Sequence, residues 1–248
     1  MMINRYIFSQ KDFDSGSLTV LASIVHKFSE PGEYHGNVFR DKDVVGKFSI
    51  IVNEDTCAKE IKNQVNIDLK SLDLPAHQHL ESLECNCYQL NSGGYAVFHV
   101  STGTGGYSVQ IKKVGTNCGP EQVFDSKNLS TNDLFTVTVL RPGTYSIKNI
   151  LTHAKAELSV SYPEIGTIPK NPQAVQIQSE EKCFNPSKIK IKPTQGLVFS
   201  FKNPSRIKIE LTKQKEKPKT TKTKSKNENQ QRQKMLKKIK RNIKIHPR

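Results

Sequence analysis

The sequence contains no tryptophan, only five cysteines and no long uninterrupted hydrophobic run. The cysteines are odd in number and are spread from Cys57 to Cys183, so the dense disulfide framework of a small secreted domain is not expected. The longest apolar stretch, residues 18–25, is interrupted by Thr19 and Ser23 and is too short to cross a bilayer. The N-terminal residues lack the apolar core of a signal peptide. We therefore expect a cytoplasmic protein with reduced thiols and no transmembrane segment.

The positive charge of the chain is concentrated at one end. The whole chain has 38 Lys and Arg residues against 23 Asp and Glu, a formal net charge of +15. Residues 212–248 hold 15 of the basic residues and 2 of the acidic ones, a net charge of +13. Residues 1–211 keep 23 basic and 21 acidic residues, a net charge of +2. A nearly neutral body argues against a positively charged groove in the fold as the main binding feature.

Strand-like runs follow one another along the body of the chain. Its composition is 35% hydrophobic, which is enough for one core. Residues 45–52 and 65–69 alternate apolar and polar side chains with the period of a half-buried strand. Residues 94–101 and 107–112 flank the glycine-rich sequence 102–106, a pattern typical of a β-hairpin. Many short strands with turns between them predict an all-β fold, either a sandwich or a closed antiparallel barrel.

Changes of composition divide the chain into successive parts. We predict an N-terminal arm (1–16), a β-sandwich domain (17–163), a linker (164–182), additional β-strands (183–211) and a disordered basic tail (212–248). Within the additional strands, the motif of residues 185–191 recurs at residues 203–209. These strands either dock on the sandwich or form a small β unit, and docking is favoured because three short strands alone are marginally stable.

Part of the body resembles a known family. Residues 135–147, which contain a Pro-Gly-Thr-Tyr turn, and residues 157–160 resemble the end of a cupredoxin domain. Residues 184–191 and 198–203 are similar to the opening strands of such domains. The resemblance implies an antiparallel Greek-key β-sandwich. The copper site of the family requires a cysteine, a histidine and usually a methionine, whereas here only His153 stands near a ligand position, so the resemblance does not extend to a blue-copper centre.

One cluster has the side chains of a metal site. His77 and His79 are followed closely by Cys85 and Cys87. Two imidazoles and two thiolates could bind zinc, or copper in its reduced state. The spacing differs from that of zinc fingers, in which CxxC recurs. Two interpretations stay open. The four residues form a metal site, or the two histidines lie in a surface loop and the two cysteines begin a strand.

The basic tail is the clearest candidate for binding. Its dispersed cations suit counterion release from a polyanion, which produces salt-sensitive and sequence-independent affinity. The tail has no aromatic residue, so stacking on single-stranded bases is not supported. A short basic amphipathic helix is expected near residues 234–244. The predicted polyanion-binding residues are Lys213, Lys215, Lys217, Lys219, Lys222, Lys224, Lys226, Arg232, Lys234, Lys237, Lys238, Lys240, Arg241 and Lys244.

No sequence motif indicates catalysis. The chain has no G-x-S-x-G nucleophile motif, and its glycine-rich sequence is not followed by the GK[ST] of a phosphate loop. We therefore expect a non-enzymatic binding protein whose tail contacts nucleic acid or an anionic membrane surface, without a required cofactor. The alternatives are a zinc- or copper-binding protein, and a structural or assembly subunit that contacts a protein partner through its basic arm.

Overall fold

A computed structural model describes residues 6–54, 63–73, 86–115, 119–162 and 173–215. The chain divides into two units, Met1–Lys215 and Glu216–Arg248, and the second unit lies outside the described residues together with the predicted amphipathic helix. The regular secondary structure of the described residues consists of β-strands and one helical turn, α1 (Tyr6–Ser9), so the predicted all-β class is confirmed. None of their helices is long and apolar enough to cross a membrane.

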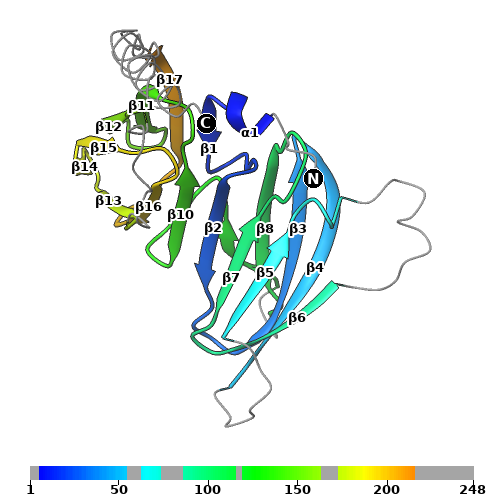
Figure 1. Cartoon of the computed structure of the whole chain (residues 1–248). Coiled ribbons are helices and arrows are strands. Elements are labelled where there is room, and N and C mark those ends of the chain that lie inside the picture. Colours follow the sequence, from blue (N-terminus) through cyan, green and yellow to red (C-terminus); the bar gives the residue numbers. More distant parts are fainter. Residues whose placement is uncertain (1–5, 55–62, 74–85, 116–118, 163–172, 216–248) are drawn as a thin grey trace, which may run out of the picture. The chain divides into compact units, whose positions relative to one another are not determined.

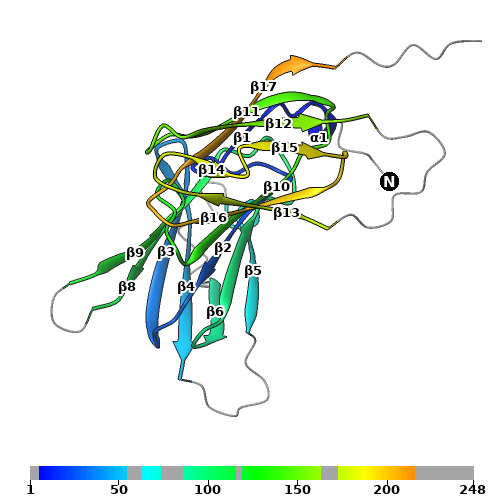
Figure 2. The ribbon, with the colours of Figure 1, turned by 90° about the vertical axis from the view of Figure 1, so that its left-hand side faces the viewer.

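The strands form three sheets (Figures 1 and 2). The carboxyl-terminal sheet has the order β1 (Asp12–Asp14), β17 (Ile207–Gln214), β11 (Gly143–Asn149), β12 (Lys155–Val160) and β15 (Lys188–Ile191). The shared sheet has the order β14 (Phe184–Asn185), β13 (Val175–Ser179), β16 (Gly196–Phe201), β10 (Asp133–Thr138), β2 (Ala22–Lys27), β7 (Tyr95–His99) and β5 (Gln64–Asp68). The amino-terminal sheet has the order β6 (Asn86–Asn91), β4 (Asp43–Asn53), β3 (Gly32–Arg40), β8 (Tyr107–Lys113) and β9 (Glu121–Asp125).

The shared sheet takes part in two sandwiches. In the first, Phe98 of β7 lies against the amino-terminal sheet, with its ring centroid 5.4 Å from that of Phe124 and 5.9 Å from that of Phe48. In the second, Asn149 of the carboxyl-terminal sheet donates a hydrogen bond of 3.2 Å to Ser179 of β13. The strands β2 and β10 pair with each other and join the two halves of the shared sheet. The predicted additional strands at 183–211 therefore belong to a second sandwich that also uses β10–β12.

The glycine-rich sequence 102–106 does not close a hairpin, and this prediction was wrong. β7 belongs to the shared sheet, whereas β8 pairs with β3 and β9 in the amino-terminal sheet. The connection passes from one sheet to the other, and the amides of Gly106 and Tyr107 donate to the Leu18 carbonyl. Gly105 has φ of 77°, and a Cβ there would lie 2.7 Å from the same carbonyl oxygen. Glycine is thus required for a close crossing rather than for a tight turn.

The first residues of the chain add a strand to the second sandwich. β1 pairs antiparallel with β17, although residues 1–16 are expected from the sequence to form an arm. Phe13 is 1% exposed in the core, and Arg206 forms hydrogen bonds of 2.9 and 2.8 Å with both carboxylate oxygens of Asp14. The expected linker 164–182 likewise contains β13, which pairs parallel with β16. Such short strands carry little periodic signal, because their identity depends on the neighbour that completes their hydrogen bonds.

A buried polar pair lies where the two sandwiches meet. His26 of β2 and Asp133 of β10 face each other in register, with 2.6 Å between Nδ1 and Oδ1. The imidazole packs against the rings of Phe28 and Phe124. The second carboxylate oxygen of Asp133 accepts hydrogen bonds from the backbone and the hydroxyl of Ser130. Both carboxylate oxygens of Asp133 therefore have hydrogen-bond partners, as a buried charged group requires.

We expect Asp133→Asn to lower the free energy of unfolding by about 1–3 kcal/mol. One carboxylate oxygen of Asp133 contacts His26 and the other contacts Ser130, and the amide of asparagine has a nitrogen in place of one of these two oxygens. Urea unfolding measures this change. The matched control is Asp43→Asn at an exposed position of β4, which should alter stability by less than about 0.5 kcal/mol. Equal stability of the two variants would contradict the role assigned to the pair.

Candidate polyanion-binding surface

Two of the predicted polyanion-binding residues lie within the described chain. β17 continues to Gln214, so the ordered body extends past the predicted start of the tail at residue 212. Lys213 is exposed and pairs with Thr144 of β11. The side-chain ammonium of Lys215 donates a hydrogen bond of 3.0 Å to the Ser159 hydroxyl, and the backbone carbonyl of Lys215 accepts one of 3.0 Å from the Tyr162 hydroxyl. The other predicted residues, from Lys217 to Lys244, lie outside the described residues.

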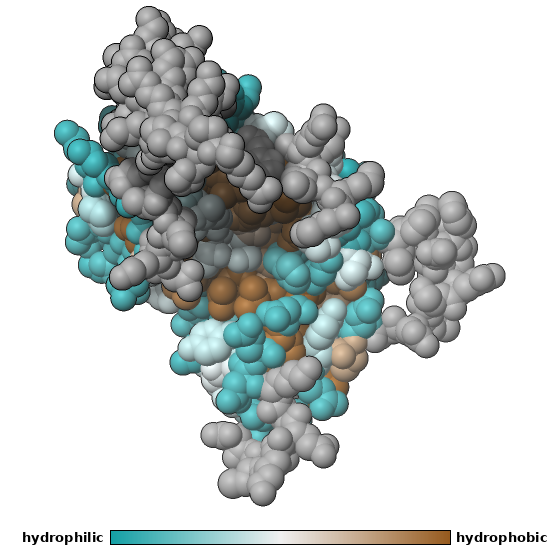
Figure 3. Space-filling model, in the orientation of Figure 1, coloured by the Kyte–Doolittle hydropathy of each residue, from teal (hydrophilic) through white to brown (hydrophobic). Residues whose placement is uncertain are grey.

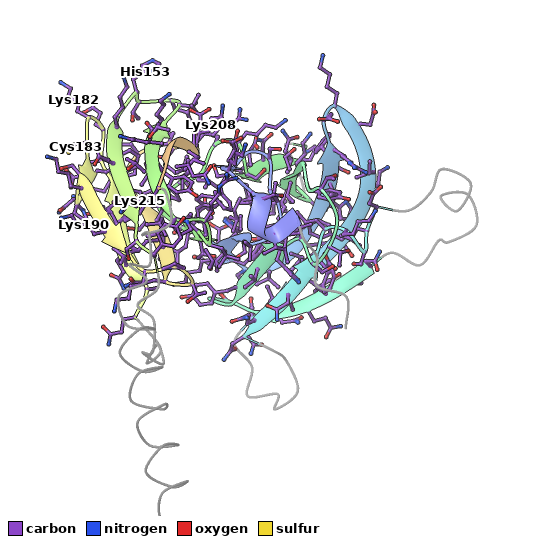
Figure 4. All side chains as sticks on the ribbon, turned by 45° about the horizontal axis from the view of Figure 1, so that its top comes forward. His153, Lys182, Cys183, Lys190, Lys208 and Lys215 are labelled. Carbon is purple, nitrogen blue, oxygen red and sulfur yellow. The ribbon has the colours of Figure 1, made fainter. Side chains whose placement is uncertain are left out.

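The outward surface of the carboxyl-terminal sheet is rich in lysine. Its strands alternate, so that Ile147, Leu158 and Ile189 are buried while their neighbours point away from the core. Figure 4 shows Lys190, Lys208 and Lys215 on this sandwich. We name the outward lysines of this sheet the lysine face. It consists of Lys148, Lys155, Lys188, Lys190, Lys208, Lys213 and Lys215.

The strand register arranges the lysine face in rows. One row runs from Lys190 through Ser159 and Thr144 to Lys213, across four neighbouring strands. Because adjacent strands are about 4.8 Å apart, this row extends over about 14 Å. Serine and threonine hydroxyls lie between the ammonium groups, and both group types donate hydrogen bonds to phosphate oxygens. This row therefore presents phosphate-binding donors, whereas the adjacent row consists of Lys188, Glu157, Ser146 and Glu210 and so contains two carboxylates.

Acidic residues neutralise only part of the lysine face. Glu210 lies 2.7 Å from Lys208 and 3.3 Å from Lys148. The hydrogen bond from Lys208, followed by that from Lys148, lowers the pKa of Glu210 below its ordinary value, and the same bond raises the pKa of Lys208. Within the described chain, the other lysines of the face form no ion pair within 4.0 Å. Glu157 lies opposite Lys188 in the register of β12 and β15, so among the described residues Lys155, Lys190 and Lys213 are lysines of the face with neither a bound nor an opposing carboxylate.

The two sandwiches differ in charge. Residues 18–132 have 10 basic and 13 acidic residues, a net charge of −3, whereas residues 1–17 and 133–215, which include β1, have 15 basic and 8 acidic residues, a net charge of +7. Hydrophilic residues predominate on the left in Figure 3, where Figure 1 shows β12 and β15. The near neutrality of residues 1–211 therefore conceals an uneven distribution of charge, with the excess of basic residues in the second sandwich.

The structure describes one residue of the predicted metal cluster. Cys87 lies exposed on β6, with its thiol free. His77, His79 and Cys85 lie outside the described residues. Among the residues that are described, no group of three or more His, Cys, Asp or Glu side chains could hold a metal ion. The zinc or copper site therefore stays a prediction.

Sequence reasoning missed the lysine face because its members are far apart along the chain. Lys155 and Lys188 come from β12 and β15, which pair parallel only after an intervening crossover. The alternation Lys188-Ile-Lys190 was the available signal, since it predicts two cations on the face opposite a buried isoleucine. Which strand lies beside it could not be read from the sequence.

Comparison with known proteins assigns no family to this chain. No family model matches the chain, and no similar curated protein or solved structure was found. The all-β class rests on the structure itself, and the cupredoxin-like Greek-key topology stays a prediction.

Proposed function

We propose that this protein is a non-enzymatic binding protein that holds a polyanion, either nucleic acid or an anionic membrane surface, through its basic tail and its lysine face together. One observation carries the proposal. Lys213 and Lys215 begin the tail on the outward side of the sheet that also presents Lys188 and Lys190. The first residues of the predicted tail therefore belong to the lysine face, and the cations of residues 216–248 follow them directly in the sequence.

The side chains of this surface favour recognition of phosphate groups over recognition of bases. The outward positions of β11, β12 and β15 are occupied by Lys, Ser, Thr and Glu. The tail contains no aromatic residue, which removes the stacking platform used for single-stranded bases. Contacts of lysine and hydroxyl groups with phosphate position a partner without reading its sequence. Binding should accordingly be sequence-independent and weakened by salt.

Neutralising the lysine face tests the contribution of the folded body. In the full chain, the triple variant Lys155→Gln, Lys188→Gln and Lys190→Gln should bind duplex DNA or phosphatidylserine vesicles about tenfold more weakly at ~0.1 M salt. The slope of log affinity against log salt for DNA should become shallower by roughly 2, because up to three phosphate contacts are lost. Fluorescence anisotropy for DNA and cosedimentation for vesicles measure these changes.

The matched control removes the same number of exposed lysines from the other sandwich. The control variant combines Lys42→Gln in the turn between β3 and β4, Lys47→Gln on β4 and Lys112→Gln on β8, all in the first sandwich. This variant loses the same net charge, so an equal loss of affinity in both variants would indicate a general charge effect. Unchanged affinity and salt slope in the Lys155, Lys188 and Lys190 variant would remove the folded body from the proposed binding surface.

A further inference from the structure

An apolar pair is exposed at one end of the basic sandwich. Ile150 and Leu151, in the turn between β11 and β12, are 39% and 46% exposed. Single exposed apolar residues are ordinary on protein surfaces. Among the exposed large hydrophobic residues of the described chain, however, these two are the only consecutive pair. Together they form a small apolar tip on an otherwise hydrophilic turn.

Hydrogen bonds to buried groups fix the backbone of this turn. Asn149 is 1% exposed, and its side-chain oxygen accepts a hydrogen bond of 3.1 Å from the Leu151 amide. Its side-chain nitrogen donates one of 2.9 Å to Ser205. The Ile150 amide donates to the Arg206 carbonyl at 2.8 Å. A turn fixed in this way presents its apolar side chains without further ordering, which reduces the entropic cost of binding.

A row of lysines lies beside the apolar tip. Lys148 and Lys155 stand on either side of the turn and are paired in the register of β11 and β12. Lys208 of β17 is the next residue in the same row, and Glu210 is the acidic group bound to both Lys148 and Lys208. His153 lies exposed within the turn, and Figure 4 shows it at the end of the sandwich away from Lys215. The side chains beside the apolar tip therefore include three lysines against one glutamate, and we call this group the cationic collar.

We infer that the β11–β12 turn inserts Ile150 and Leu151 into the interface of a membrane that contains anionic phospholipid, while Lys155, which has no ion pair among the described residues, binds a headgroup phosphate. An apolar tip with a cationic collar matches both layers of such an interface, because the affinity of an interfacial segment combines buried apolar area with attraction to anionic lipids. The inference rests on the proposed function and selects the membrane as its polyanion.

Two other partners fit these observations less well. Nucleic acid would engage the lysines, but its phosphate backbone offers the two aliphatic side chains no apolar environment. A stable protein interface buries roughly 800 Å² on each partner, far more than two partly exposed side chains can cover. A lipid interface needs only a few inserted side chains when cations add to the attraction.

Vesicle binding of the full chain with Ile150→Ser and Leu151→Ser tests the inference. Both changes leave the backbone hydrogen bonds of the turn intact. We expect the partition onto phosphatidylcholine–phosphatidylserine vesicles to fall about 30-fold, since most of the apolar transfer energy is lost. Affinity for duplex DNA should stay unchanged. The control, Val44→Ser with Ile51→Ser, removes aliphatic side chains of 45% and 36% exposure from β4 and should retain vesicle binding.

The absence of tryptophan permits a direct measurement of insertion. Leu151→Trp places a single fluorophore at the tip and Val44→Trp places one on the other sandwich. On addition of phosphatidylserine vesicles, the emission of Trp at position 151 should shift to shorter wavelength and become protected from an aqueous quencher, whereas that at position 44 should not change. This readout needs no loss of binding and is independent of any effect of serine on folding.

Each outcome separates this inference from the function on which it rests. Membrane insertion is overturned, while polyanion binding stands, if the wild-type chain binds DNA but not vesicles. The same conclusion follows if the variant with serine at positions 150 and 151 binds vesicles normally and the fluorescence of Trp at position 151 does not shift. If the wild-type chain binds neither DNA nor vesicles at low salt, the proposed function itself fails. Loss of vesicle binding alone, together with the shift, supports the inference.

Discussion

Removal of residues 216–248 should lower the affinity for duplex DNA or phosphatidylserine vesicles at least about a hundredfold at ~0.1 M salt. The deleted segment carries 13 basic and 2 acidic residues, a net charge of +11. Each neutralised DNA phosphate contributes about 0.9 to the slope of log affinity against log salt concentration. The loss of even half of the contacts between the basic residues of the tail and phosphates therefore reduces both the affinity and this slope strongly. Truncation after Lys215 retains all of β17 and the bond from Lys215 to Ser159, so the folded body stays complete.

The control for this truncation is a chain in which the order of residues 216–248 is scrambled. The scrambled tail keeps the charge and should keep the affinity for DNA, because counterion release depends on the number of contacts and not on their order. A truncated protein that binds DNA with wild-type affinity and salt slope would show that the tail is a solvated extension. In that case the lysine face alone would have to account for any binding.

Phe13→Ala is expected to lower the free energy of unfolding by about 3–5 kcal/mol, which is the range for removal of a fully buried aromatic side chain. Phe13 is 1% exposed and pairs with Ile209 in β17, so its ring completes the core of the second sandwich from the first strand of the chain. Such a loss is a large fraction of the total stability of a domain. Chemical unfolding followed by circular dichroism measures it.

Lys11→Ala is the matched control on the same segment. The Lys11 side chain is exposed, and the hydrogen bond that Lys11 accepts from Leu211 involves its backbone carbonyl. This change should cost less than about 0.5 kcal/mol. If Phe13→Ala were as stable as Lys11→Ala, the N-terminal segment would behave as the detached arm expected from the sequence, and β1 would not be part of the stable fold.

The predictable part of this fold comes from local alternation. Residues 65–69 and 133–138 place every second side chain in the core, so their strands could be located from the order of residues alone. β1 and β14 could not, because a strand of two or three residues has too few positions to show a period. The expected hairpin around residues 102–106 failed for a related reason, since alternation identifies a strand but not the strand beside it.

The same division applies to the candidate binding surface. The charge of the tail is a property of composition, and a segment of 33 residues with few apolar side chains can be recognised as basic without any knowledge of the fold. The lysine face depends on the pairing of β12 with β15 and of β11 with β17, because that pairing brings Lys155, Lys188 and Lys213 to one side of one sheet. Long-range strand pairing is set by the complementarity of the whole core, which no local pattern contains.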